Sequence, residues 1–300
     1  MRTLSRSARW MAVLFLLVSF AVAQPAQSAP ATPAAPGYVV TAPVANMFRG
    51  ASEDTDVVSQ AILGSNVAVI EDKGDWINVR TADNYTGWIR AKEMRKLSGP
   101  AYGEDATTVV VSGLSANIYR EQNVTKHAPI LTAPFDSRLV AEIPADPNAR
   151  WFKVTLPDGR VGYIQNGDVS QSSKKLTIPE DIELAKKFLG VTYTWGGTSS
   201  FGYDCSGFMQ MLVKHRGYLM PRDADIQASW TGVAPVERKD LQPGDLLYFG
   251  SSPQKITHTG MYIGDGMFIH DTTNTHPMVQ ISKLDDAYWT KLLVAQRRVK

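Results

Sequence analysis

Two stretches between residues 38 and 170 repeat each other, and this repeat leaves few folds open to them. VANMFRGAS (residues 44–52) aligns with SANIYREQN (115–123), and WINVRTADNYTGWI (76–89) aligns with WFKVTLPDGRVGYI (151–164). In each copy a Trp opens an alternating strand, a polar turn follows, and Gly-aromatic-Ile opens the next strand. Short strands and frequent turns predict two small β-barrels. One sandwich with internal symmetry is the alternative.

The two copies resemble bacterial SH3-like (SH3b) domains, which commonly accompany cell-wall enzymes. The resemblance covers residues 38–97 and 108–170. Neither copy contains a cluster of catalytic residue types, so both are predicted to bind or position rather than react. The polar linker QSSKKLTIPED follows, and IPEDIELAKKFLG then predicts a helix that opens a third domain at residues 178–300, with Pro179 in its first turn.

The N-terminus has the pattern of a targeting segment. Three arginines in the first ten residues precede a 13-residue stretch, apolar except for Ser19, that ends in Ala-Val-Ala. A bilayer span needs about 20 apolar residues. We therefore predict a cleaved signal peptide over residues 1–23, with an uncleaved anchor as the alternative. A Pro/Ala-rich leash over residues 24–37 follows. The mature protein should be exported, periplasmic or associated with the cell wall, with no transmembrane anchor.

Charge and cysteine content exclude several classes of protein. The formal charge of +2 includes three arginines of the signal, so the mature chain has 31 − 3 = 28 basic and 29 acidic residues, or −1. This balance argues against a nucleic-acid partner. A single cysteine excludes an intrachain disulfide and any zinc site built on several thiolates. We predict no cofactor and a monomer.

The single cysteine, Cys205, lies in a setting that favours reactivity. Glycines precede it in GYDCSGFMQMLV, apolar residues that follow predict a helix, and Asp204 stands where a helix cap would. Cys205 would then occupy the first helical turn, where the helix dipole and unpaired N–H groups favour the nucleophilic thiolate. A buried, inert thiol is the alternative.

Two histidines could activate that thiol. His258 and His270 lie near the two ends of the hairpin sequence THTGMYIGDGMFIHD. With a three-residue loop at Gly264-Asp265-Gly266, Gly260 would face His270, and both imidazoles would share one face with Cα atoms about 7–8 Å apart. A two-residue loop would put them on opposite faces. The shared face supplies a base and a group that orients it. The HxxxH spacing typical of metal sites is missing, so no metal site is predicted.

The C-terminal motifs resemble those of the NlpC/P60 family of cell-wall cysteine peptidases. They are YTWGGTSSFGYDCSGFMQ, LQPGDLLYFG and ITHTGMYIGDGMFIH, and the resemblance covers residues 178–300. It implies a papain-like α+β domain, so the expected protein is multidomain, with two SH3-like β-barrels before the peptidase. It also implies that Cys205 is the nucleophile, His258 the general base and then acid, and His270 the residue that orients His258.

The whole arrangement resembles a subgroup of γ-D-glutamyl-L-diamino acid endopeptidases, which cut peptidoglycan stem peptides. The resemblance assigns substrate contacts to Tyr193, Asp204, Ser206 and Asp223. The last three would hold the free α-amine of an N-terminal L-Ala. In the subgroup the first SH3b domain adds an acid and a tyrosine, for which Glu53 and Tyr85 are the candidates.

The implied activity is hydrolysis of the γ-D-Glu–diamino acid bond in peptidoglycan-derived peptides with a free N-terminal L-Ala. Two alternatives stay open. The protein could cut peptide cross-links of the polymeric wall, or it could be a non-catalytic wall-binding protein in which the barrels do the work. A pocket for the free amine would distinguish the peptidase of free peptides from both alternatives.

Overall fold

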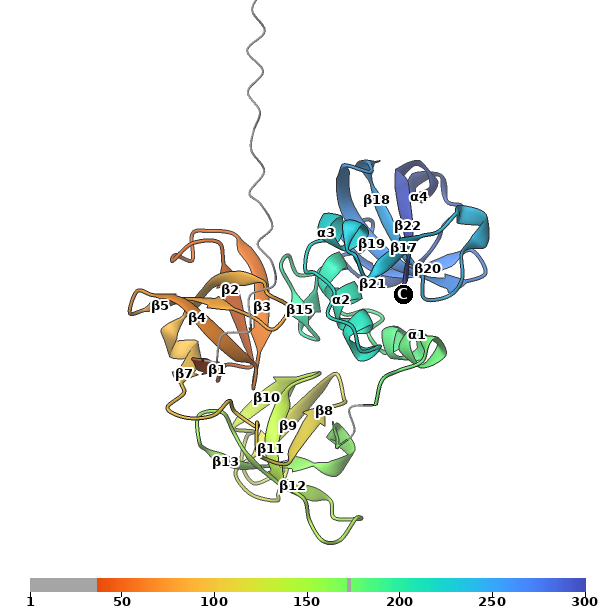
Figure 1. Cartoon of the computed structure of the whole chain (residues 1–300). Helices are drawn as coiled ribbons and strands as arrows, with labels where there is room; N and C mark the ends of the chain where they lie inside the picture. The colour runs from red at the N-terminus through yellow and green to blue at the C-terminus, as the bar shows by residue number, and fades with distance from the viewer. Residues whose placement is uncertain (1–36, 172–173) are drawn as a thin grey trace, which may run out of the picture. The chain divides into compact units, whose positions relative to one another are not determined.

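The computed structural model describes residues 37–171 and 174–300 (Figure 1). The predicted signal peptide and all of the predicted leash except Gly37 lie outside the described residues. Within the described part of the chain, no helix combines the length and the apolar character needed to cross a membrane.

Residues 38–96 form an antiparallel sheet of seven strands in the order β3-β2-β6-β5-β4-β1-β7, here called the first β-repeat. A short 3₁₀ helix, η1 (Ala91–Glu93), precedes its last strand. The strands are β1 (Tyr38–Val40), β2 (Val44–Phe48), β3 (Val57–Ile62), β4 (Asn66–Asp72), β5 (Trp76–Arg80), β6 (Thr86–Arg90) and β7 (Met94–Lys96).

Residues 108–170 form a second sheet of seven strands in the order β10-β9-β13-β12-β11-β8-β14, the second β-repeat. Its strands are β8 (Thr108–Val111), β9 (Ser115–Tyr119), β10 (Leu131–Pro134), β11 (Arg138–Glu142), β12 (Trp151–Thr155), β13 (Val161–Gln165) and β14 (Val169–Ser170). Strand for strand, the two orders correspond, and a 3₁₀ helix precedes the last strand of each, which in the second β-repeat is η2 (Asn166–Asp168). This agrees with the internal repeat in the sequence.

The aligned Trp and Gly positions have packing reasons. Trp76 of β5 packs edge-on against Phe48 with ring centroids 5.4 Å apart, and Trp151 of β12 packs against Tyr119 at 5.8 Å. The aligned glycines lie where strands approach closely. A Cβ on Gly87 would come within 2.9 Å of Met47 Cβ, and the equivalent Gly162 has the same constraint. The repeat is therefore a repeat of core contacts.

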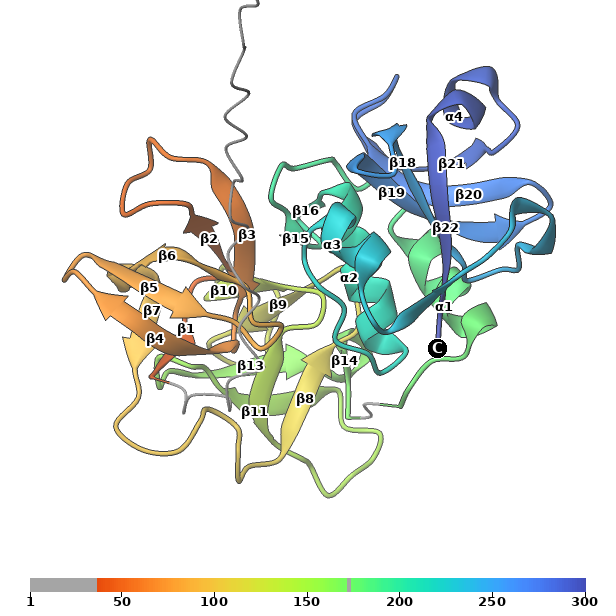
Figure 2. The same ribbon diagram turned by 45° about the horizontal axis from the view of Figure 1, so that its top comes forward.

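The C-terminal region, residues 178–300, places helices against an antiparallel sheet of six strands in the order β17-β22-β18-β19-β20-β21 (Figure 2). The sheet strands are β17 (Val233–Pro235), β18 (Leu246–Ser252), β19 (Lys255–Gly264), β20 (Met267–Thr272), β21 (Met278–Lys283) and β22 (Leu293–Val299). The remaining elements are α1 (Ile178–Lys187), β15 (Thr198–Ser199), β16 (Gly202–Tyr203), α2 (Cys205–His215), α3 (Ala224–Ser229), η3 (Arg238–Asp240) and α4 (Ala287–Leu292).

The helix predicted at IPEDIELAKKFLG is present as α1, with Pro179 near its start. The Glu180 carboxylate accepts a hydrogen bond from the Thr177 backbone N–H at 2.8 Å, which satisfies one of the free donors at the helix start. Gly190, with φ of 88°, follows the helix end, where positive φ favours glycine.

Alternate residues of the sheet pack into two separate apolar clusters. Tyr248, Met261 and Ile269 pack with α2 residues such as Phe208 in the larger one. Residues such as Phe249 and Phe268 pack with Trp289 of α4 in the smaller one. Because strand side chains alternate between faces, β19 and β20 each send residues into both layers.

In each β-repeat, the residue that follows the third strand is apolar and packs in the core of the region that comes next in the chain. Leu63, after β3, is buried among core residues of the second β-repeat. Phe135, after β10, is buried in the C-terminal core and packs edge-on against Phe188 at 5.2 Å. The first β-repeat also contacts the C-terminal region directly, where Gln60 accepts a hydrogen bond from the Thr198 backbone N–H at 3.0 Å.

Candidate active site

Cys205 is the first residue of α2, as the sequence predicts. Asp204 caps this helix, because its Oδ1 accepts a hydrogen bond from the Gly207 backbone N–H at 2.7 Å. Gly207 is required here, since a Cβ would lie 2.2 Å from the Gly197 carbonyl oxygen. The DCSG motif is thus a helix start pressed against the glycine loop before it.

The prediction of a thiolate at Cys205 is wrong, because the structure favours the protonated thiol. Cys205 is only 8% exposed. Burial, with a smaller contribution from the negative charge of Asp204, raises the pKa of the Cys205 thiol to about 12. The Thr259 backbone and the guanidinium of Arg222 act in the opposite direction but do not compensate. Desolvation therefore outweighs the N–H groups at the helix start, and the resting thiol is neutral.

Alkylation of Cys205 should therefore depend steeply on pH. Because only the thiolate reacts, the rate constant for iodoacetamide should rise about tenfold per pH unit between roughly pH 6 and 9. The measurement is unambiguous, since the chain has one cysteine. A rate that is high and independent of pH below neutrality would contradict this prediction, because it would reveal a preformed thiolate–imidazolium pair.

The hairpin brings His258 and His270 together by a route different from the predicted one. Met261 pairs with Ile269 and Tyr262 with Phe268, which is the register expected for a shared histidine face. The strands, however, leave only Asp265 and Gly266 between them, both with positive φ. A register shift between Tyr262 and Gly264 accommodates the extra residue. The predicted three-residue loop length is wrong, but the two histidines do face each other.

A chain of hydrogen bonds runs through the two imidazoles. His258 Nε2 lies 2.8 Å from His270 Nδ1, and His270 Nε2 lies 2.9 Å from the Ser282 hydroxyl on β21. Trp289 of α4 stacks on His258 with ring centroids 5.3 Å apart. Burial lowers the pKa of both histidines below their usual range. Both rings are therefore neutral near pH 7, and Ser282 and Trp289 complete their surroundings.

Cys205 and the histidines meet at β19. The Thr259 backbone contributes a hydrogen bond at the Cys205 sulfur, and Thr259 directly follows His258 in the chain. The side chains of His258 and Thr259 leave the strand in opposite directions. The thiol is thus held at the same point of the strand that carries the first imidazole.

Asp204 is held by a buried arginine that sequence reasoning missed. Arg222, 2% exposed, donates to both carboxylate oxygens of Asp204, at 2.9 Å and 2.5 Å. It also donates to Ser206 Oγ at 2.7 Å. The pair is already neutral, so Asp204 offers little net charge to a ligand. Arg222 lies in the sequence PRDAD. An arginine that becomes buried there needs a carboxylate partner, and this could have indicated the pair.

Removing this arginine should destabilise the fold strongly. Arg222→Met would leave the carboxylate of Asp204 buried without its counter-charge, and we expect a loss of about 3–5 kcal/mol in the free energy of unfolding. Arg49→Met is the matched control, because the ion pair of Arg49 with Asp56 is exposed and should contribute about 0–1 kcal/mol. Denaturant titration measures both, and equal losses would contradict the assignment.

The structure brings Asp223 and Tyr85 together across the chain. The Tyr85 hydroxyl, on the β5–β6 loop of the first β-repeat, donates to the Asp223 carboxylate, with distances of 3.2 and 3.3 Å to the two oxygens. Asp223 is exposed and precedes α3. Burial by its surroundings raises the pKa of Asp223 above its usual value, and the nearby Arg222 opposes that change. Among the described residues Asp223 forms no ion pair, since the neighbouring Arg222 pairs with Asp204.

Two further candidates are placed differently. Tyr193 is half-buried and interacts electrostatically with Cys205 and Asp204. Glu53 lies on the exposed β2–β3 loop and pairs with Arg90 of the same β-repeat. It makes no hydrogen bond to the C-terminal region within the described residues. Only Tyr85 of the two first-repeat candidates contacts the predicted amine pocket.

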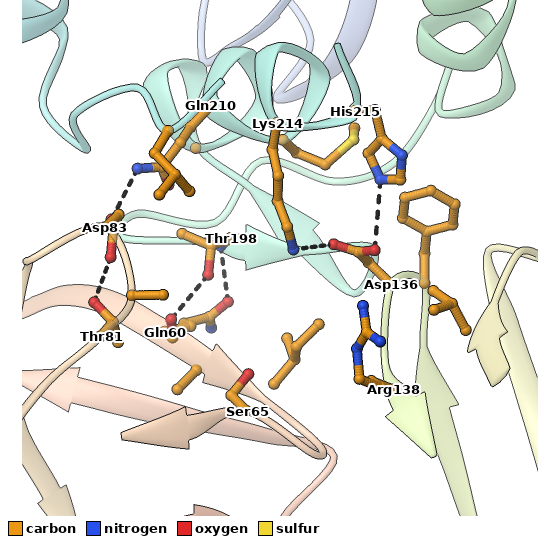
Figure 3. Close-up of a pocket in the computed structure, with 18 of the residues that line it drawn as sticks. Gln60, Ser65, Thr81, Asp83, Asp136, Arg138, Thr198, Gln210, Lys214 and His215 are labelled. Carbon is orange, nitrogen blue, oxygen red and sulfur yellow. Dashed lines mark hydrogen bonds and ion pairs between the residues drawn. The ribbon is translucent and has the colours of Figure 1, made fainter. Parts of the chain in front are cut away.

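A cavity separate from this centre lies between the β-repeats and α2. It has a volume of about 620 Å³ and is lined by both β-repeats and the later turns of α2, including Gln210, Lys214 and His215 (Figure 3). Lys214 and His215 both face the Asp136 carboxylate there. Cys205 and His258 are not among the lining residues. Across residues 37–171 and 174–300, no three His, Cys, Asp or Glu side chains are arranged to hold a metal ion.

Comparisons with known families agree with this geometry. A model described as NlpC/P60 family matches residues 190–298. A model described as bacterial dipeptidyl-peptidase Sh3 domain matches residues 47–93, within the first β-repeat.

Curated relatives and a solved structure extend over most of the chain. A gamma-D-glutamyl-L-lysine dipeptidyl-peptidase of Bacillus subtilis is 32% identical over 83% of this chain and 83% of that protein. A protein of the same name from Bacillus cereus is 34% identical over 71% of this chain and 66% of that protein. The crystal structure of an NlpC/P60 family protein from Bacillus cereus covers 87% of this chain, with 25% identity and a TM-score of 0.76. With an SH3-like domain before the matched C-terminal region, the chain belongs to the NlpC/P60 family.

Proposed function

We propose that this protein is a cysteine peptidase that hydrolyses the γ-D-Glu–diamino acid bond of peptidoglycan stem peptides with a free N-terminal L-Ala. One observation carries the proposal: the hydrogen-bonded pair His258–His270 lies at the point of β19 that contacts the Cys205 sulfur. The names of the Bacillus relatives support the bond that is cut, because both describe γ-D-glutamyl peptidases.

The hydrogen-bond chain determines which nitrogen acts as the base. If His270 donates from Nε2 to Ser282, its Nδ1 is an acceptor, and His258 must donate from Nε2. Nδ1 of His258 then has a free lone pair. It takes the thiol proton as the Cys205 sulfur attacks the γ-carbonyl carbon, and it later protonates the leaving amine. Water hydrolyses the resulting thioester.

Because the Cys205 thiol and the His258 imidazole are both neutral, the proton passes between them during the attack and not before it. Both the thiol and the imidazole are uncharged in the resting site, so charge separates only as the sulfur–carbon bond forms. The backbone N–H of Cys205, the first residue of α2, would stabilise the oxyanion. His270 and Ser282 hold the His258 ring in the tautomer this requires.

The amine pocket differs in one respect from the sequence expectation. Because Arg222 neutralises Asp204, the ammonium group of the substrate would be offset chiefly by Asp223, with Ser206 Oγ as an additional acceptor. Tyr85 holds the Asp223 carboxylate from the first β-repeat. That contact supports a pocket closed on one side, which admits short peptides with a free amine. Within the part of the chain that the structure describes, Glu53 pairs with Arg90 and makes no hydrogen bond to the other residues of this pocket. Tyr193 would line the cleft beside Cys205.

We also propose that both β-repeats are SH3-like barrels, at residues 38–97 and 108–170, followed by a papain-like peptidase domain at 178–300. The equal strand orders of the two repeats support this. Export to the periplasm or the cell surface, after removal of residues 1–23, fits a substrate that is made there. A monomer is sufficient for the pocket, since all of its residues come from one chain.

The test is direct digestion of L-Ala-γ-D-Glu-L-Lys and of its diaminopimelate counterpart. Mass spectrometry should detect L-Ala-D-Glu and the free diamino acid. Intact wall sacculi digested in parallel should release little, because their L-Ala is acylated. Release of cross-linked peptides from sacculi without cleavage of the free peptides would favour the polymeric-wall alternative. Absence of all hydrolysis would favour the wall-binding alternative.

A further inference from the structure

Gln210 lies where α2 meets the first β-repeat, and it takes no part in the proton transfers at Cys205. It belongs to the same helix, of which Cys205 is the first residue. Its side-chain Nε2 donates to Asp83 Oδ2 at 2.8 Å (Figure 3) and to the Met220 carbonyl oxygen at 2.8 Å. A carboxylate and a carbonyl oxygen both accept, so only the amide nitrogen can serve them. One side chain of this helix therefore binds two separate segments of the chain.

Asp83 connects this contact to the loop that carries Tyr85. The loop closes on itself, because the Thr81 N–H donates to the Tyr85 carbonyl oxygen at 3.0 Å and the Asn84 N–H donates to the Thr81 carbonyl oxygen at 2.9 Å. The Thr81 hydroxyl also donates to the Asp83 carboxylate. Asn84 has a φ of 66°, which asparagine tolerates in tight turns. A contact at Asp83 therefore also limits where the Tyr85 hydroxyl can lie.

Met220 connects the same contact to the segment that carries Asp223. Met220 is 1% exposed and stands three residues before Asp223 in the chain. This segment has a second anchor, because the buried side chain of Gln227 on α3 donates to the Pro221 carbonyl oxygen at 2.9 Å. The Asp223 side of the predicted amine pocket is therefore held twice, from α2 and from α3.

The corresponding turn of the second β-repeat makes a different contact. It closes in the same way, because the Leu156 N–H donates to the Arg160 carbonyl oxygen at 2.8 Å. Asp158, which aligns with Asp83, pairs with Arg160 of its own turn at 2.7 Å. Among the described residues Asp158 makes no hydrogen bond to the C-terminal region. The turn itself therefore needs no aspartate directed at a helix, so the contact of Asp83 with Gln210 is particular to the first β-repeat.

We propose that Gln210 is a positioning residue for the amine pocket. It holds the Tyr85 loop and the Asp223 segment against the helix whose first residue is the nucleophile. The inference rests on the proposed function, which gives Asp223 the substrate amine. The hydrogen bond between Tyr85 and Asp223 is exposed to solvent, and such a bond alone contributes little. The two bonds of Gln210 arrange both partners before the substrate arrives, which lowers the cost of ordering them on binding.

Gln210→Met removes the donor and keeps a side chain of similar length that a helix accepts readily. We expect kcat/KM for L-Ala-γ-D-Glu-L-Lys to fall about tenfold, the effect of one hydrogen bond to a charged group. KM should rise while kcat stays within about twofold, because the pocket holds the amine equally in the ground and transition states. Gln210→Lys keeps a donor of similar reach and should recover most of the loss. A fall in kcat alone, an unchanged kcat/KM, or no recovery by lysine would overturn the proposal.

A double variant shows whether Gln210 acts through Tyr85. Tyr85→Phe removes the hydroxyl that reaches Asp223, so adding Gln210→Met to it should lower kcat/KM by less than about a further twofold. Losses that multiply would mean a general structural role for Gln210. Gln165→Met is the matched control, because Gln165 is also half-buried but lies in the second β-repeat, where it accepts from Arg150 at 2.8 Å. Its kcat/KM should match wild type. Multiplying losses, or an equal fall in the control, would overturn the proposal.

Amide hydrogen exchange gives a readout that needs no substrate. In Gln210→Met the amides of residues 81–85 should exchange several-fold faster than in wild type, because their loop loses its contact with α2. Residues 156–160, the corresponding turn of the second β-repeat, should exchange at the wild-type rate. Faster exchange at 81–85, with no hydrolysis of the peptide by the wild type, would retain Gln210 as the anchor of the loop and reject the proposed substrate. Hydrolysis by the wild type, with exchange and kcat/KM unchanged in the variant, would do the reverse.

Discussion

Replacing Cys205 by alanine should abolish cleavage of L-Ala-γ-D-Glu-L-Lys, with kcat reduced by at least about 10⁴-fold. The alanine variant cannot form the thioester, and nothing else in the described site offers a comparable nucleophile. Ser206, the neighbouring hydroxyl, accepts from Arg222 and donates to Asp204, so it is not placed to replace the sulfur. Initial rates with enzyme freshly purified from a host that lacks this peptidase measure the effect.

The fold should survive this change. Cys205→Ala removes one sulfur atom from a small buried side chain, and a helix accepts alanine readily. His258→Ala should lower kcat comparably, because it removes the base from the same unit, and the double variant should be scarcely slower than either single one. Additive losses would show that the two residues act separately. Activity near wild type in either single variant would reject the mechanism.

Replacing Asp223 by asparagine should lower kcat/KM for the free peptide by about 10- to 100-fold. A hydrogen bond to a charged group contributes about 1.5–3 kcal/mol, and a factor of ten corresponds to about 1.4 kcal/mol. Asparagine preserves the size of the side chain and can still accept from Tyr85, so the variant removes mainly the negative charge. The loss should be large because Asp204, the other carboxylate of the predicted pocket, is already paired with Arg222.

Asp225→Asn is the control for that variant. Asp225 is an exposed carboxylate two residues along the chain, and its side chain accepts from the backbone N–H of Ile226. It shares the general charge of the region without the contact to Tyr85. Its kcat/KM should stay within about twofold of wild type, the scale of an ordinary surface change. Equal losses in both variants would mean that Asp223 acts only through long-range charge.

Local features of the site could be predicted from the sequence. The helix start at Cys205 with its cap by Asp204, and the facing histidines, each follow from a motif that spans about fifteen residues or fewer. Over such a short span chain geometry limits the possibilities. The repeat likewise predicted matching sheets, because Trp and Gly recur at the same core contacts. Such inferences rest on short-range rules.

The features that were missed depend on burial and on distant contacts. The pKa of Cys205 depends on how much of the structure covers the thiol, which no motif states. Ser282 reaches His270 only through the register of β20 and β21. The two-residue turn with its register shift is one of two ways to reach the same pairing. No short-range rule states which residue Glu53 contacts, and in the structure its partner is Arg90.

The central claim is that the site selects a γ-D-glutamyl peptide by its free N-terminal amine. Comparing kcat/KM for L-Ala-γ-D-Glu-L-Lys and for its N-acetyl form on the wild-type enzyme tests this most directly. We predict a preference of at least about 100-fold for the free peptide, because acetylation removes the charge that Asp223 would offset. The preference should shrink in Asp223→Asn. Equal turnover of the two peptides by the wild type would contradict the account.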